Sequence, residues 1–276
     1  MNTSERETLF EGKPGDVRLP AAPLLRVIGQ LRFGPLAVLA AGDDAAQMFI
    51  KLLAEDYPFV EQGQEQTLLF ASGQPVQQQN VGKVWRLRTA DQQSVAALTT
   101  AGALTYETTS YPGRTAFCRE LTRLTDALRQ ATHLQSFNRV GVRYSNQLTG
   151  PETLAQLPQL IHPELLGVVG APVAAGATLS HQVTQAQFEL GPRAKVLAHF
   201  GCLPANGAFD ESLPPAPEPS WILDIDSFEE FPDVTSALPA ESEAVSTAAH
   251  ACAEMAYAFF RWATKPQFLR HFGGKP

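Results

Sequence analysis

The sequence predicts an α+β fold in which an antiparallel sheet carries a long helix across one face. Between residues 84 and 148 apolar residues first alternate with polar ones and then recur at helical spacing. Alternation is typical of a strand with one buried face, and helical spacing is typical of an amphipathic helix. The predicted elements are three hairpin arms (Val84–Thr89, Ser94–Thr99 and Leu104–Thr108), a helix (Pro112–His133) and a closing strand (Asn138–Leu148).

The first hairpin arm is predicted from the direction of its side chains. Trp85 and Leu87 share one parity, and Arg86 and Arg88 share the other, so an apolar and a basic face result. Asp91-Gln92 forms the turn to the next arm.

The central helix has a start signal and an apolar stripe. Ser110 is expected to cap it, and Pro112 lies in the first turn, where its missing N–H costs nothing. The residues that recur along the stripe are Phe117, Leu121, Leu124 and Leu128. The strand after it is expected to place Val140, Val142, Tyr144 and Asn146 on one face and Arg139, Gly141 and Arg143 on the other.

The chain before these elements predicts one strand and one helix. Residues 25–33 alternate as a strand, and Gly42-Asp43-Asp44 supplies the N-cap of a helix that runs to about Glu55. The glutamine-rich stretch Gln62–Asn80 is interpreted as a mobile polar loop that encloses a short strand, Thr67–Ala71.

The second half of the chain repeats this style, since sheet is again followed by a long helix. We therefore predict a flexible segment (1–20) and two pseudo-duplicated halves (21–148 and 149–276) packed into one continuous core. A proline-rich surface loop, Leu203–Ser220, separates two of the strands. The other expected elements are helices at Glu152–Gln159, Pro239–Ala263 and Pro266–Phe272, and strands at Thr178–Leu190, Ala194–Cys202 and Trp221–Phe228.

Composition narrows the class of protein. The 276 residues are 44% hydrophobic and 18% charged, with a net charge of −7, so a uniformly basic nucleic-acid binder is not expected. No apolar run approaches the about 20 residues that cross a bilayer, and the N-terminus has no signal-peptide h-region. Cys118, Cys202 and Cys252 are an odd and sparse set, which favours a reducing compartment. The chain is therefore predicted to be cytoplasmic, with no contact to a membrane.

Several segments resemble a sporadically distributed, uncharacterised family of bacterial proteins. The resemblance covers Pro23 to Phe272 and is carried by residues 23–33, 84–91, 104–111 with Phe117, 139–146, and the C-terminal helix with His250, Phe259 or Phe260 and Thr264. It implies a fold grouping and a bacterial, cytoplasmic origin. It implies no catalytic residue.

The polar stripe of the C-terminal helix contains the candidate catalytic residues. His250, Glu254 and Tyr257 lie three and four residues apart and therefore share one side of the helix. A histidine four residues before a glutamate can hold one tautomer and act in acid–base chemistry. The alternative interpretation is a solvated helix face, since any amphipathic helix has one.

Four arginines on predicted strands are the candidate binding residues. Arg86, Arg88, Arg139 and Arg143 would form an anion-binding or acidic-partner surface, because guanidinium groups suit carboxylate and phosphate. The alternative is an exposed sheet face whose arginines discourage edge pairing. Asp91 and Glu107 are the acidic residues expected to oppose them.

No cofactor or metal is predicted. Asp224 and Asp226 alternate on one strand and have the oxygen ligands that hard cations prefer, but the sequence shows no third ligand. Gly273-Gly274-Lys275 is a tail without the strand and helix of a phosphate-binding loop.

Three functions stay open at this point. The preferred hypothesis is a non-enzymatic binding protein for a protein partner or a small anionic ligand. The second is an enzyme of unfamiliar type that uses His250 and Glu254, with Tyr257 beside them and Arg143 orienting an acidic substrate. The third is a nucleic-acid-associated component of a defence or regulatory locus, which the acidic net charge disfavours.

Overall fold

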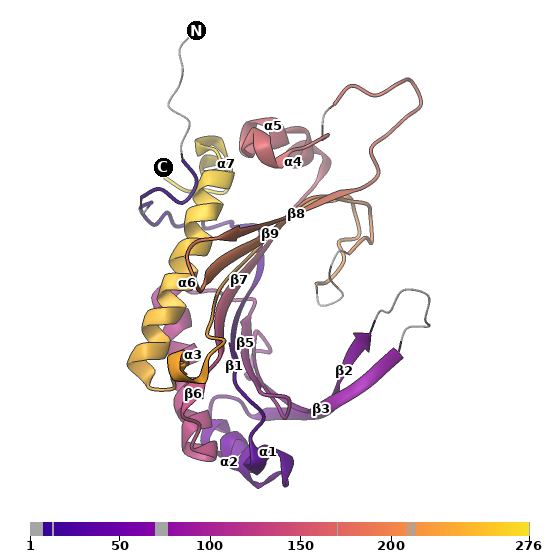
Figure 1. The fold of residues 1–276 in the computed structure, drawn as a ribbon. Helices are drawn as coiled ribbons and strands as arrows, with labels where there is room; N and C mark the ends of the chain where they lie inside the picture. The colour runs from indigo at the N-terminus through magenta and orange to yellow at the C-terminus, as the bar shows by residue number, and fades with distance from the viewer. Residues whose placement is uncertain are drawn as a thin grey trace. The chain divides into compact units, whose positions relative to one another are not determined.

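The computed structural model describes residues 8–12, 14–69, 77–169, 171–208, 210 and 213–275 (Figure 1). The chain forms two compact units, each built from segments that are distant in sequence. Unit 1 comprises residues 1–25, 143–227 and 253–276, and unit 2 comprises residues 26–142 and 228–252. The fold is α+β with an extensive antiparallel sheet, as the sequence predicts. Pseudo-duplication of the halves 21–148 and 149–276 stays a prediction.

Unit 2 contains the strands that the sequence predicts most directly. Their order is β2-β3-β4-β5-β1, and neighbours in this order are antiparallel. The elements of this unit are β1 (Leu24–Arg32), α1 (Ala37–Ala40), α2 (Asp44–Leu53), β2 (Phe59–Leu69), β3 (Gln77–Arg88), β4 (Ser94–Thr99), β5 (Ala103–Thr108), α3 (Arg114–Thr132), β6 (Ser136–Phe137) and β11 (Leu238–Pro239), and of these only β1 begins in unit 1.

The helix α3 covers one face of this sheet. Its stripe Phe117, Leu121, Leu124 and Leu128 is fully buried, as predicted. The ring centroids of Phe117 and Tyr106 of β5 lie 5.0 Å apart. A side chain on Gly29 of β1 would collide with Leu121, since a Cβ there would lie 2.9 Å from its Cδ2 atom. The helix therefore approaches the sheet as closely as a glycine allows, and Figure 1 shows α3 along one side of β1 and β5.

Unit 1 contains the strand order β10-β9-β8, and β7 adjoins β10. Strands β7 and β10 and helix α6 each contribute residues to both units. The elements are β7 (Arg139–Thr149), α4 (Pro151–Ala155), α5 (Leu157–Leu160), a 3-10 turn (Pro163–Leu165), β8 (Gln182–Glu189), β9 (Ala194–Leu203), β10 (Ser220–Glu230), α6 (Ser242–Ala263) and α7 (Pro266–His271). A second 3-10 turn (Val234–Ser236) belongs to unit 2.

The core of unit 1 is formed by one parity of its strands. Trp221, Leu223 and Ile225 of β10 are buried together with Phe259 of α6 and Phe268 of α7. Segment 1–20, predicted to be flexible, also contributes to this core within its described part. Leu9, Phe10, Val17 and Leu19 pack against it, and the ring of Phe10 lies 5.4 Å from that of Phe188.

The glutamine-rich stretch differs from the predicted loop. β2 and β3 form a long hairpin, with a bulge at Glu65/Gln66. Glutamine contributes the same backbone hydrogen bonds to a ladder as any other residue, so a polar composition does not prevent pairing. The predicted short strand Thr67–Ala71 belongs to β2 up to Leu69, and residues 70–76 lie outside the described residues.

Two predicted helix caps are not formed. The N-cap position of α3 is Gly113, with φ of 125°, and Ser110 lies before it. Asp43 is at the N-cap position of α2 but makes no side-chain cap bond there. Its carboxylate instead accepts a hydrogen bond from Lys83 Nζ at 2.7 Å. A charged partner on β3 therefore competes with the helix N-terminus for this oxygen.

We predict that Gly201→Ala destabilises the protein by at least about 2 kcal/mol. Gly201 of β9 has φ of 146°, and a Cβ there would lie 1.9 Å from the carbonyl oxygen of Gln182 on β8. Denaturant unfolding measures the change. Gly34→Ala is the control, because a Cβ at Gly34 meets nothing within 4 Å. A Gly201→Ala protein as stable as the control would contradict the backbone geometry described here.

Candidate functional site

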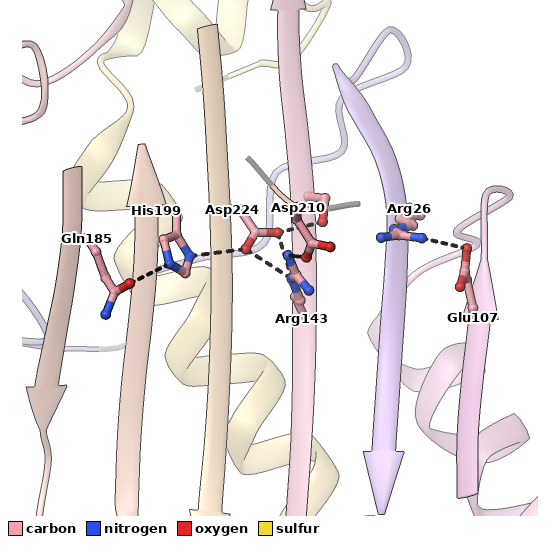
Figure 2. Close-up of polar contacts among 8 residues, drawn as sticks. Arg26, Glu107, Arg143, Gln185, His199, Asp210 and Asp224 are labelled. Carbon is pink, nitrogen blue, oxygen red and sulfur yellow. Dashed lines mark hydrogen bonds and ion pairs between the residues drawn. The ribbon is translucent and has the colours of Figure 1, made fainter. Parts of the chain in front are cut away.

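The open face of the unit 1 sheet carries a linked set of polar side chains. Because Trp221, Leu223 and Ile225 enter the core, Asp224 and Asp226 point to the opposite face. Figure 2 shows Gln185, His199, Asp224 and Arg143 side by side, on the strands β8, β9, β10 and β7. Strand alternation thus collects these groups on one surface.

Asp224 is the centre of this network. Its side chain is 2% exposed, and both carboxylate oxygens accept hydrogen bonds from Arg143 Nε, at 2.9 and 3.0 Å. The hydroxyl of Ser145, two residues along β7, donates to Asp224 Oδ1 at 2.6 Å. A buried carboxylate is costly without such donors, and charge-assisted hydrogen bonds are among the stronger ones. The contacts therefore hold Asp224 and Arg143 in one fixed arrangement.

The proline-rich loop between β9 and β10 supplies a second carboxylate. Asp210 Oδ2 accepts a hydrogen bond from Arg143 Nη2 at 2.5 Å. Burial by itself would lower the pKa of Arg143, but the attraction of Asp224 and Asp210 and their hydrogen bonds outweigh burial and raise it. Arg143 therefore keeps its positive charge throughout the accessible pH range.

His199 extends the network to the next strand. Its Nδ1 atom lies 3.7 Å from Asp224 Oδ2, and its Nε2 atom lies 3.0 Å from Oε1 of Gln185. The amide oxygen of Gln185 can only accept, so in this arrangement Nε2 carries a proton and donates it. The ring plane is thus set by groups on two neighbouring strands.

A cavity of about 340 Å³ opens at this network. The three aspartates and one arginine of its lining together contribute a net charge of −2. The lining residues are Arg143, Leu197, His199, Asp210, Asp224 and Asp226. Such a lining can bind a group with hydrogen-bond donors and positive charge, and Leu197 adds an apolar contact.

Of the four predicted arginines, only Arg143 belongs to this cavity. Arg86, Arg88 and Arg139 lie in unit 2. Arg88 is 3.9 Å from Glu61, and Arg139 donates to Gln30 at 3.0 Å while its guanidinium lies over the ring of Phe228. The predicted acidic opponents have other contacts: Asp91 bonds to Thr89 and Gln93 in its own turn, and Glu107 pairs with Arg26 (Figure 2).

The three candidate catalytic residues do not line this cavity. His250, in unit 2, places Nδ1 2.8 Å from the carbonyl oxygen of Ser246 in its own helix. Glu254 is half-buried in unit 1. The Tyr257 hydroxyl accepts a hydrogen bond from the Val17 amide at 2.8 Å and donates to the Gly15 carbonyl at 3.1 Å. Tyr257 therefore anchors the N-terminal segment.

In the ranges that the structure describes, no group of three or more histidine, cysteine or acidic side chains is arranged to hold a metal ion. Across the same residues, no helix combines the length and apolar character that crossing a bilayer requires.

In the sequence, Asp224 and Asp226 were considered only as metal ligands. His199, Asp210 and Gln185 were not predicted as site residues. Strand alternation could have indicated the position of His199. It shares its strand face with Lys195 and Leu197, opposite the buried Val196 and Ala198. No local pattern marks Asp210, because its contact with Arg143 spans 67 residues.

Comparison with protein-family models, with curated proteins and with solved structures gives no match for this chain.

We predict that Asp224→Asn and Arg143→Met each cost about 2–3 kcal/mol of stability, and that the double variant loses clearly less than the sum. Asp224→Asn leaves Arg143 with Asp210 as its remaining carboxylate, and Arg143→Met leaves the buried carboxylate of Asp224 without its arginine. A double-mutant cycle by chemical denaturation measures the coupling. The control is Glu189→Gln, which removes a partly exposed ion pair with 3.9 Å between Lys195 Nζ and Glu189 Oε2. This change should cost less than about 0.5 kcal/mol of stability. If the loss of stability in the double variant equals the sum of the losses at Asp224 and Arg143, the two side chains are not coupled and the prediction is wrong.

We also predict that Tyr257→Phe destabilises the protein by about 1–2 kcal/mol and speeds proteolysis within residues 8–22. The change removes one hydroxyl that bonds to two backbone groups of this segment. Limited proteolysis with mass spectrometry locates the cleavage. His250→Gln serves as the comparison and should leave cleavage in this segment unchanged. Equal cleavage of wild type and Tyr257→Phe would refute the anchoring role.

Proposed function

We propose that this chain is a non-enzymatic binding protein and that the cavity of unit 1 receives a cationic group. The observation that carries the proposal is the lining: three aspartates surround about 340 Å³ of space together with one arginine, one histidine and one leucine. An ammonium or guanidinium group would find carboxylate acceptors there, and an attached alkyl chain would contact Leu197.

A cationic ligand is better supported at this cavity than the anionic ligand expected from the arginines. Arg143 is the arginine of the lining, and Asp224 and Asp210 already accept hydrogen bonds from it. An anion would have to compete with both carboxylates for the same guanidinium and would face their negative charge at short range. The same argument disfavours a nucleic-acid phosphate at this position.

Binding is better supported than proton transfer. Arg143 has a raised pKa and cannot release a proton in an ordinary pH range. Asp224 is occupied by Arg143 and Ser145, which makes it a positioning group. The alternative enzyme built on His250 and Glu254 gains no support, since neither residue lines the cavity.

We further propose that the protein lies in the cytoplasm of a bacterium and belongs to the family that its sequence resembles. Cys118, Cys202 and Cys252 form no disulfide bond among the described residues, which supports a reducing compartment. We retain the proposal that the two sheet-plus-helix halves are pseudo-duplicated, because each contains strands followed by a long helix, α3 or α6.

We predict that putrescine, spermidine or agmatine binds in isothermal titration calorimetry and that glutarate and phosphate do not. Asp226→Asn should weaken binding of the amine about tenfold, which is the effect of losing one charge-assisted contact. Glu152→Gln is the matched control: it removes the same charge from an exposed position on α4 and should leave affinity unchanged. Binding of the anions alone, or equal affinity of Asp226→Asn and wild type, would overturn the proposal.

A further inference from the structure

The sheet of unit 2 has an open face that the cavity of unit 1 does not involve. We propose that this face docks an acidic, extended peptide segment of a partner protein. Its central row is formed by Arg86, Ala97, Thr105 and Gln30, which lie directly opposite one another on β3, β4, β5 and β1. The next row along the same strands contains Arg88, Val95, Glu107 and Ile28.

Around the central row, the burial of alternate residues shows that this face is uncovered, while Arg26 of β1, on the same face, is 7% exposed and pairs with Glu107. On β4 and β5 the core-facing Ala96, Leu98 and Leu104 are completely buried. Their neighbours Val95, Ala97 and Thr105, which point the other way, are only half-buried. Phe59, opposite Arg88 on β2, is 52% exposed. Exposed fractions of this size are expected when a side chain is shielded only by its neighbours on the sheet and is not covered by another element.

Positive charge stands at both sides of this face. Arg86 and Arg88 project from β3, and Arg32 projects from the far strand β1. Among the described residues neither Arg86 nor Arg32 forms an ion pair, and Arg88 has only Glu61, 3.9 Å away and itself 64% exposed. Arg32 donates to the side chain of Gln30 at 2.9 Å, which directs its guanidinium toward the central row.

The spacing of these charges suits an extended peptide. β3 and β1 are three strand steps apart in the order β3-β4-β5-β1, which corresponds to about 14 Å. An extended chain covers that distance in about four to five residues. Between the arginines lie the short side chains of Ala97 and Thr105, so a backbone can approach the sheet there. Two acidic residues about four positions apart would meet both groups of arginines.

The composition of the face favours an acidic peptide over a nucleic acid. Phe59, Val95 and Ile28 offer apolar contacts that a peptide side chain can use and a phosphate backbone cannot. Glu61 and Glu107 lie on the same face and contact Arg88 and Arg26, which lowers the positive charge that a densely charged phosphate backbone would need. The net charge of −7 would also oppose the approach of a polyanion. A short acidic peptide is affected mainly by the charges next to its binding face, because salt screens the more distant ones.

The test is fluorescence anisotropy with a short fluorescein-labelled peptide in which glutamate alternates with valine. The full chain should bind this peptide, bind it more weakly at high salt, and not bind the same peptide with glutamine in place of glutamate. The double variant Arg86→Gln, Arg88→Gln should bind about tenfold more weakly. The matched control is the double variant Arg119→Gln, Arg129→Gln, which removes two arginines from α3.

Each result decides the proposal, and circular dichroism melts confirm that both double variants are folded. Equal loss in both double variants, or no binding of the glutamate peptide by the wild-type chain, would overturn it. Tighter binding of labelled single-stranded DNA than of the peptide would overturn it in favour of a nucleic-acid surface. Amine binding at the unit 1 cavity, measured on the same proteins, is expected to be unaffected by Arg86 and Arg88, so the two proposals fail separately.

Discussion

In each unit one face of the sheet is buried against helices, and this constraint sends the charged side chains of the strands to the opposite face. A strand directs successive side chains to opposite faces, so an apolar set on one parity commits the other parity to the face away from the helices. In unit 1 the burial of Trp221 and Leu223 thereby fixes the side on which Asp224 lies. Asp224 is still shielded by its neighbours, so donors are required, and Arg143 and Ser145 of β7 provide them.

Stability alone does not account for this arrangement. Exchanging a buried ion pair for apolar residues of similar volume is often neutral or stabilising, because desolvation offsets the attraction between the charges. The pair does, however, fix the direction of donors and acceptors at the cavity wall, since Arg143 contacts both Asp224 and Asp210 and cannot rotate freely. A preorganised polar surface lowers the entropic cost of binding a ligand, which stability measurements do not register. The network is therefore compatible with the binding role that we propose.

The sequence predicted the features that depend on local periodicity. Trp85 and Leu87 enter the core, and the stripe from Phe117 to Leu128 is buried, because a period of two or of three and four is fixed by backbone geometry. Contacts between distant residues were not predictable, since nothing local records them. Arg143 meets Asp224 across 81 residues and Asp210 across 67. Tyr257 was placed on a polar helix stripe, but its partners Val17 and Gly15 belong to a segment expected to be flexible.

The four arginines illustrate why charge at a surface follows from pairing and not from residue type. Taken as sequence, Arg86, Arg88, Arg139 and Arg143 form one class and predict one anion-binding surface. In the folded chain Arg143 is held by two aspartates, so its surroundings carry excess negative charge and suit a cation. Arg86 forms no ion pair among the described residues, so its side of the unit 2 sheet stays positive. Arginine thus supports opposite ligand preferences in the two units, and the carboxylates that contact it decide between them.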